Sequence, residues 1–200
     1  MGCISTADGE LLRFSNNNLG MKYNKRYTVL TALIVALGGF LLGFDSAVIS
    51  GAVPFIKNYF VLNEIQLGWS VSCLILGAML GNAVAGPLSD RYGRKNILIV
   101  TSLLFAVSAI SSALATQFDF FIVARIIGGV GVGGAILIAP IYIAEIAPAE
   151  KRGRLVSFNQ LNIVLGISVA YFSNYFLLEV GESNWRWMLG VEAIPAIIYF

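Results

Sequence analysis

Residues 118–144 read FDFFIVARIIGGVGVGGAILIAPIYIA, an apolar run whose charged residues are Asp119 and Arg125. A helix of about 20 mostly apolar residues spans the hydrocarbon core of a bilayer. This run is therefore long enough to cross a membrane. The whole chain has the same character, because 58% of its 200 residues are hydrophobic and 12% are charged, whereas a soluble domain averages roughly 25% charged residues. The composition excludes an ordinary soluble domain.

Working outward from this run, the sequence contains five further apolar segments. They are residues 28–50, 67–86, 97–115, 156–178 and a last segment that begins near Trp187. The last has too few residues before Phe200 to cross a bilayer comfortably at about 1.5 Å per residue, so we expect a truncated last helix. The prediction is an all-α membrane protein, with a disordered cytoplasmic tail over residues 1–27 and a six-span domain over residues 28–200.

The basic residues of the connecting segments predict the orientation. Cytoplasmic segments of membrane proteins carry an excess of Lys and Arg. Ten basic residues fall on the side of the amino terminus and two on the other side, so we expect a cytoplasmic amino terminus in a plasma or inner membrane. The ten are Arg13, Lys22, Lys25, Arg26, Arg91, Arg94, Lys95, Lys151, Arg152 and Arg154, and the two are Lys57 and Arg186. We also expect Trp69, Trp185 and Trp187 at the outer interface, where tryptophan is enriched.

Several function classes lack the residues that they need. The chain has no histidine, two cysteines and a net charge of +2. We expect no metal site, no cofactor and no enzyme activity, because neither a nucleotide-binding loop nor a nucleophile–base pair occurs. The basic residues follow membrane topology, so they do not indicate nucleic-acid binding. The opening Met1-Gly2-Cys3 fits a loose lipidation pattern, which we attribute to chance.

Charged residues inside the apolar segments carry the most information. Asp45, Arg125 and Glu192 each lie roughly 8–10 Å below the outer edge of a span, at 1.5 Å per residue. An isolated charge at the centre of a span costs about 2.5–3.5 kcal/mol, so such residues face a cavity or pair with one another. Two interpretations stay open at this point. A carboxylate that exchanges Arg125 for a proton would couple proton movement to conformational change, whereas a static ion pair would only fix helix register.

Polar residues of the fifth segment form a second group. Gln160, Ile167, Tyr171 and Asn174 share one helical face at spacings of three and four residues. An amide, a phenol and a second amide suit a hydroxylated ligand in a wet central cavity. Hydrogen bonds between helices are the equal alternative. The glycines at 128–134, 38, 39 and 43 predict close helix packing rather than a phosphate-binding loop.

Five motifs carry a resemblance to a known family. The motifs are GPLSDRYGRKN at 86–96, GFDSAVISG at 43–51, RIIGG at 125–129, PIYIAEIAP with RGR at 140–154, and NWRWM at 184–188. The first resembles the signature of the major facilitator superfamily at each fixed position. The others resemble its sugar porter family, in particular bacterial D-xylose–proton symporters. The resemblance implies a twelve-span transporter that moves a monosaccharide and a proton, of which this chain holds the amino-terminal six-helix half and lacks the carboxy-terminal half.

The resemblance also implies roles for individual residues. It assigns proton coupling to Asp45, Arg125 and Glu192, and a hydrogen bond to sugar hydroxyls to Gln160. It assigns a cytoplasmic gate to a charged set whose members match the family motifs residue by residue. These are Asp90, Arg91, Arg94, Glu145, Arg152 and Arg154.

Two departures from the family pattern concern the substrate. Leu42 stands where the family often has an aromatic residue, and Ile167 stands where xylose symporters have a second glutamine. With Gln160 and Tyr171, these positions form the predicted sugar site, and the sugar stays open among hexose, pentose and cyclitol. An uncoupled sugar facilitator, and an inactive half that needs a second six-helix half, are the alternative functions.

Overall fold

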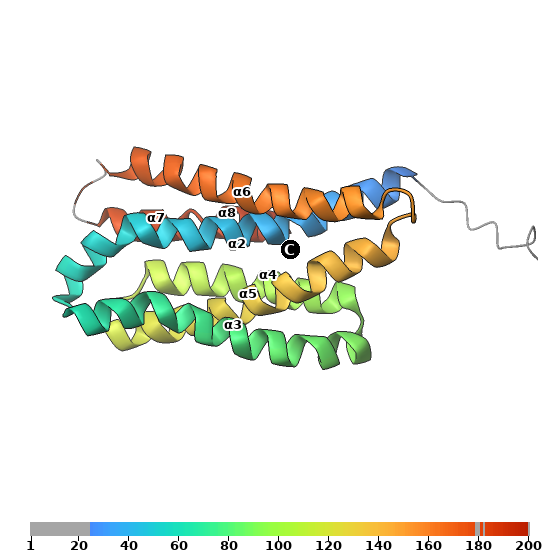
Figure 1. Ribbon diagram of the computed structural model, residues 1–200. Coiled ribbons are helices and arrows are strands. Elements are labelled where there is room, and N and C mark those ends of the chain that lie inside the picture. The colour runs from blue at the N-terminus through green and yellow to red at the C-terminus, as the bar shows by residue number, and fades with distance from the viewer. Residues whose placement is uncertain (1–24, 179–180, 182, 200) are drawn as a thin grey trace, which may run out of the picture.

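The computed structural model describes residues 25–178, 181 and 183–199, and these residues form helices and no strands (Figure 1). The predicted all-α class is confirmed. The helices form two neighbouring groups, with α2, α6, α7 and α8 above α3, α4 and α5 in the view of Figure 1. Their bounds are α2 Lys25–Phe60, α3 Glu64–Tyr92, α4 Arg94–Ala113, α5 Phe118–Ile146, α6 Arg152–Leu177, α7 Asn184–Gly190 and α8 Ala193–Tyr199.

Local sequence signals explain where the long helices begin and end. Asn63 caps α3, because its side chain accepts a hydrogen bond from the backbone N–H of Gln66 while the Gln66 side chain accepts one from the Asn63 backbone. Gly93 separates α3 from α4 with a φ of 88°, a conformation that glycine adopts without steric cost. The chain therefore reverses at this residue within a very short connection.

Five helices of the described region are long and apolar enough to cross a membrane. They are α2 from Ile34 on, α3, α4, α5 and α6, and each overlaps one of the segments predicted from the sequence. The complete helices α2, α3 and α5 contain their predicted segments, whereas α4 and α6 begin earlier than predicted and end before the predicted last residues, Ala115 and Leu178. The predicted tail overlaps α2, which begins at Lys25. Its remaining residues, including Gly2 and Cys3, lie outside the described residues.

The sixth segment differs from the single helix expected from about Trp187. It forms two short helices, α7 and α8, which are separated at Val191 and Glu192. Pro195 has no backbone N–H, so it cannot donate the helical hydrogen bond to the carbonyl of Val191. The N–H of Ile194 bonds to that carbonyl instead. This places Glu192 at a break in the helix rather than within a regular turn.

Glycines set the packing of α3 on α5. The buried residues of α3 are all small and recur every three or four positions, which gives the helix one flat face. A Cβ atom at Gly77 would meet the backbone of α5, and one at Gly129 or Gly133 would meet the backbone of α3. The two backbones are therefore in direct contact. This arrangement confirms the close packing predicted from the glycine-rich run.

Two clusters of buried apolar side chains make up the core, one at each end of the bundle. The second cluster contains Trp185, which is fully buried and packs against Phe60 and Phe121. Trp185 therefore belongs to the core, because its neighbours on α2 and α5 cover it. Trp69 and Trp187 are exposed, and the outer-interface position of the three tryptophans stays a prediction.

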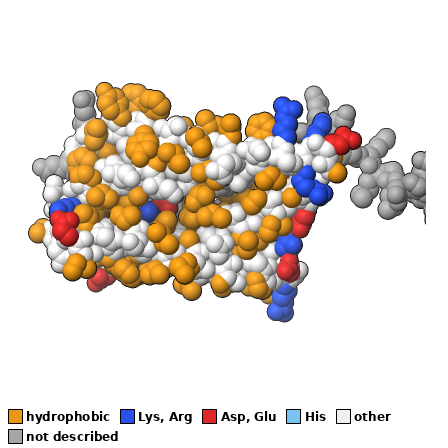
Figure 2. Space-filling model, in the orientation of Figure 1, with side chains coloured by type: hydrophobic (Ala, Val, Ile, Leu, Met, Phe, Trp, Pro, Cys, Tyr) orange, Lys and Arg blue, Asp and Glu red, His pale blue; other side chains and the backbone are white. Residues whose placement is uncertain are grey.

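Charged side chains gather at the two ends of the bundle (Figure 2). We call the end that holds the α3–α4 and α5–α6 connections the basic end. Its basic side chains are Arg91, Arg94, Lys95, Lys151, Arg152 and Arg154. We call the other end, where α2 meets α3, the opposite end.

Replacing Gly133 with alanine should destabilise the protein, because the new Cβ would press against the Ala78 carbonyl of α3. Overpacking of this kind costs about 1–3 kcal/mol. The matched control is Gly68→Ala on α3, where the new Cβ meets nothing within 4 Å and helix propensity favours alanine. Thermal unfolding in detergent should show a lower midpoint for G133A than for G68A; equal midpoints would contradict the packing.

Candidate functional site

A buried ion pair lies at the centre of the molecule. Arg125 of α5 donates a hydrogen bond from Nη1 to Oδ1 of Asp45 on α2, and the two side chains are 3% and 4% exposed. The pair joins the two helix groups of Figure 1, because α2 belongs to one and α5 to the other. Both residues stand in apolar segments that are long enough to span a membrane. The structure thus brings together two charges that are 80 positions apart in the sequence.

Glu192 completes the cluster from the break between α7 and α8. It is 4% exposed, its side chain is in hydrogen-bond contact with Asp45, and it interacts electrostatically with Arg125. Two carboxyl groups form a hydrogen bond only when one of them carries a proton. One proton also makes the charges balance, because a single guanidinium neutralises a single carboxylate. The structure therefore brings two acids and one base together in one buried cluster.

The arginine retains an unused donor. Nε of Arg125 is buried and has no hydrogen-bond partner in the described part of the chain. A guanidinium has five N–H donors in a fixed fork, so Arg125 is able to bind Asp45 and Glu192 in turn or together. The second carboxylate, that of Glu192, lies between α7 and α8 and so is not part of a continuous helix.

A groove of about 330 Å³ lies between α2, α5 and α6. Gly38 and Gly39 line it on α2, and Ser157 and Gln160 on α6 supply polar atoms. Leu42, whose side chain is half-buried, lies on the α2 wall. The remaining lining residues are Ala135, Ile136, Pro140, Val156, Asn159 and Ile163.

Two of the predicted sugar-site residues do not line this groove. Ile167 is half-buried and packs against the apolar cluster that contains Phe44. Tyr171 is exposed and lines a separate aromatic pocket with Phe172 and Tyr175. Of the four predicted residues, the structure places Gln160 and Leu42 in one groove.

Asn174 does not belong to the ligand-binding face that the sequence suggested for α6. It is buried against α2, where Nδ2 donates hydrogen bonds to the carbonyls of Val48, at 3.2 Å, and Ala47, at 3.5 Å. The α6 helix reaches α2 closely at this point, since a Cβ at Gly51 would collide with the Asn174 side chain. Its assignment to a ligand-binding face is wrong, and the interhelical alternative holds.

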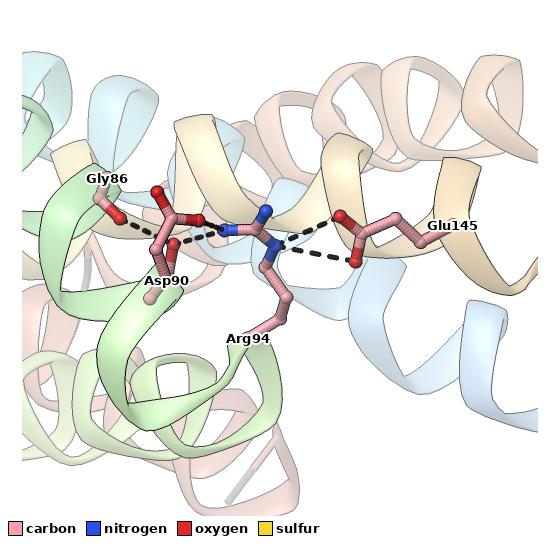
Figure 3. A network of polar contacts seen from close by, with 5 residues as sticks. Gly86, Asp90, Arg94 and Glu145 are labelled. Atoms are coloured by element: carbon pink, nitrogen blue, oxygen red, sulfur yellow. Dashed lines mark hydrogen bonds and ion pairs between the residues drawn. The ribbon is translucent and has the colours of Figure 1, made fainter.

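A second polar network lies at the basic end (Figure 3). Arg94 donates from Nη1 to Asp90 Oδ1 at 2.6 Å and from Nε to Glu145 Oε1 at 3.1 Å. The arginine stands at the start of α4, Asp90 in the last turns of α3 and Glu145 near the end of α5. Arg94 thereby connects three helices of one group.

Ser89 is a member of this network that the sequence reasoning missed. Arg94 donates from Nη1 to Ser89 Oγ at 2.6 Å, and Ser89 Oγ donates to the Gly86 carbonyl at 2.8 Å (Figure 3). The serine is buried, so it supports the guanidinium from within the bundle. Its place between two motif residues, Leu88 and Asp90, was the available signal.

The other predicted gate residues lie apart from Arg94. The guanidinium of Arg91 lies over the ring of Tyr92, 5.5 Å from its centroid. Arg152 and Arg154 are exposed at the start of α6 and form no ion pair with the described residues. The structure thus brings together Asp90, Arg94 and Glu145 out of the six.

The structure thus combines helices long enough to span a membrane with a buried acid–base cluster and a groove between α2, α5 and α6. The family model for sugar (and other) transporters matches residues 31–200. The chain belongs to the sugar transporter family of the major facilitator superfamily.

Relatives and solved structures agree with this assignment. The chain is 44% identical to a glucose transport protein of Synechocystis over 88% of its length and 40% of the relative's. It is 47% identical to a D-xylose transporter of Levilactobacillus brevis, over 82% of the chain and 36% of the relative. It is 37% identical to the D-xylose–proton symporter of Escherichia coli, over 90% of the chain and 43% of the relative.

The same fold is present in solved structures of the proton:xylose symporter XylE. One, bound to 6-bromo-6-deoxy-D-glucose, superposes with a TM-score of 0.83 at 38% identity, over 88% of this chain and 44% of that one. An inward-open form superposes with a TM-score of 0.81 at 37% identity, over 86% of this chain and 47% of that one. The chain therefore spans less than half the length of the relatives that it matches.

Replacing the cation of the buried cluster should cost more stability than replacing one acid. Arg125→Gln leaves Asp45 buried without its partner, which costs about 3–5 kcal/mol. Asp45→Asn should cost less, because Glu192 remains to pair with Arg125. The thermal unfolding midpoint should be highest for the parent, lower for D45N and lowest for R125Q. The variant that combines D45N with R125Q should be more stable than R125Q alone.

The control for this series is Lys57→Gln, which removes a cation from an exposed ion pair with Glu64. Exposed pairs contribute about 0–1 kcal/mol, so K57Q should unfold close to the parent. A midpoint for R125Q no lower than that for K57Q would contradict a structural dependence on the buried pair.

Proposed function

We propose that this chain forms the amino-terminal half of a sugar–proton symporter that works by alternating access. The observation that carries the proposal is the buried cluster of Asp45, Arg125 and Glu192. Two acids share one base there, out of contact with bulk solvent. Such a cluster takes up or releases one proton at a defined place inside the membrane domain.

The cluster provides a physical means of coupling. When Asp45 is ionised it binds Arg125 and ties α2 to α5. When the proton held on Glu192 moves to Asp45, Asp45 loses the charge that holds the guanidinium, and Arg125 then turns to the ionised Glu192 at the break between α7 and α8. Protonation thus changes which helices are held together, as coupling requires. A ligand shifts such an equilibrium only by its different affinity for the two states.

The groove between α2, α5 and α6 supports a monosaccharide as the cargo. Gln160 offers one acceptor and two donors to hydroxyl groups, and Ser157 adds a hydroxyl. Relatives whose names refer to glucose, D-xylose and arabinose support a monosaccharide and leave the choice of sugar open.

The exposed faces of α3 and α6 support a second six-helix half as the partner. Both helices bury fewer residues than α2, α4 or α5 do. The buried residues of α6 are confined to one face, the one that packs on α2. Gln160 is exposed on this helix and faces the groove. A second half that faces α3 and α6 would enclose the groove, which the helices of this chain leave open.

The network of Arg94 supports a gate at the basic end, which we propose faces the cytoplasm. Its charges are 26–70% exposed, so they are free to form contacts across an interface. Arg91, Arg152 and Arg154 lie at the same end as unpaired cations in the described region. They add charges that carboxylates of a second half would bind when the gate closes.

Replacing Asp45 with asparagine should abolish proton-driven accumulation of sugar while leaving sugar exchange down its gradient. Asparagine keeps the shape but removes the exchangeable charge. The measurement is uptake of labelled sugar, with and without a pH gradient, by proteoliposomes that contain this half and its carboxy-terminal counterpart. Asp119→Asn is the control, because Asp119 is an exposed acid in the first turn of α5 with no ion pair in the described region. Full accumulation by D45N would exclude Asp45 as the coupling residue, whereas a parent protein that never accumulates sugar would indicate an uncoupled facilitator.

Replacing Gln160 with alanine should weaken sugar binding without uncoupling transport. Loss of one or two hydrogen bonds at about 0.5–1.5 kcal/mol each predicts a severalfold higher KM, while the number of protons moved per sugar stays the same. Ser168→Ala is the control on the same helix, because Ser168 only donates to the Val164 carbonyl. An unchanged KM in Q160A would exclude the groove as the sugar site.

A further inference from the structure

A second groove lies at the opposite end of the bundle, between the end of α4 and the α7–α8 segment. Its volume is about 390 Å³, and most of its lining is apolar. None of its residues lies in the buried cluster, in the Gln160 groove or in the Arg94 network. The lining residues are Ala113, Leu114, Ser183, Arg186, Trp187, Gly190, Val191 and Ile194.

The cation of this groove, Arg186, is held in a fixed position. Its Nη2 donates to the Ala115 carbonyl at 2.8 Å and to the Tyr59 hydroxyl at 3.0 Å. Its guanidinium also lies over the rings of Tyr59 and Trp185, each centroid 4.8 Å away. The side chain has therefore already lost its rotational freedom, so a ligand that binds it pays little for ordering it.

Among the residues that the structure describes, Arg186 has no charge partner, because none of the described carboxylates lies within ion-pair distance of it. Its Nε and Nη1 have no hydrogen-bond partner among the residues that the structure describes. Two free donors on a fixed guanidinium match the oxygens of a phosphate group, to which arginine binds by charge-assisted hydrogen bonds.

The groove continues from this cation along an apolar path. Trp187 lies beside Arg186, and Gly190, Val191 and Ile194 follow on the α7–α8 segment. At 1.5 Å per residue, Ile194 lies roughly 12 Å from Arg186 along the axis. That distance is most of one leaflet of a hydrocarbon core about 30 Å thick. The groove presents a cation first, then a tryptophan and then an apolar channel. A phospholipid has its parts in the matching order, which is phosphate, glycerol backbone and acyl chain.

We propose that this groove binds one phospholipid with an anionic head group. Its phosphate accepts hydrogen bonds from Nε and Nη1 of Arg186, and one acyl chain lies over Gly190 towards Ile194. The groove is on α4, α7 and α8, whereas the faces that we assign to a second half are on α3 and α6. The site therefore stays open to lipid in the assembled transporter, and the inference does not depend on proton coupling.

The test measures lipid retention by the full chain. The purified protein is mixed with phosphatidylglycerol or with phosphatidylcholine of the same acyl chains, and native mass spectrometry counts the bound lipids. The parent should retain phosphatidylglycerol preferentially. Arg186→Gln should lower its retention by about tenfold, as expected for the loss of a hydrogen bond to a charged group, and remove the preference.

Two further variants make the result specific. Gly190→Leu should reduce retention of both lipids, because it fills the apolar part of the groove. A Cβ there meets only the Cβ of Ala113, at 3.5 Å, so the helices need not move. Lys57→Gln removes the same charge from the same end of the bundle but lies outside the groove, and it should retain lipid like the parent.

The proposal fails under any of three results. One is equal retention of the two lipids by the parent protein. Another is unchanged retention by R186Q and G190L. The third is an equal loss in K57Q and R186Q, which would show a general effect of charge. G190L leaves the contacts of Arg186 intact, so it decides the matter even if R186Q fails to fold.

Discussion

The ion pair between Asp45 and Arg125 is the interaction on which the rest of this structure depends. It joins α2 to α5, and with them the two groups of helices. An unpaired charge in either helix would be costly at that depth, so each residue requires the other. Glycines set other close contacts, because those of α3 and α5 bring these two backbones together and those of α2 do the same for α2 and α6.

The cost of this arrangement explains why it belongs to a transporter rather than to a static bundle. A buried ion pair stabilises a fold poorly in comparison with well-packed apolar residues. Here a third ionisable group, Glu192, is added to the pair, and it stands at the one interruption among the spanning helices of the described region. The ionisable group Glu192 therefore stands where the helix is interrupted. The proposed coupling of protonation to helix movement needs a charged group at such a place.

The two ends of the bundle divide the remaining polar interactions. Arg94 at the basic end bridges acids that are partly exposed and so available for new partners. Arg186 at the opposite end is fixed by aromatic rings and a backbone carbonyl, and it lines an apolar groove. The first arginine is suited to a contact that forms and breaks with conformation. The second is suited to a ligand that stays bound.

The sequence by itself determined the class of the protein, because composition and run length respond to lipid independently of any tertiary contact. It also determined the family and the candidate charges, since a charge within an apolar segment is visible from the residue alone. Only the tertiary structure decided which side chains meet. Helical periodicity could not place Asn174 against α2 instead of in a cavity, and it could not place Trp185 in the core, because both positions depend on how neighbouring helices approach. The part of Ser89 in the Arg94 network likewise comes from how the helices meet, whereas the break near Glu192 follows from Pro195, a signal that the sequence already contains.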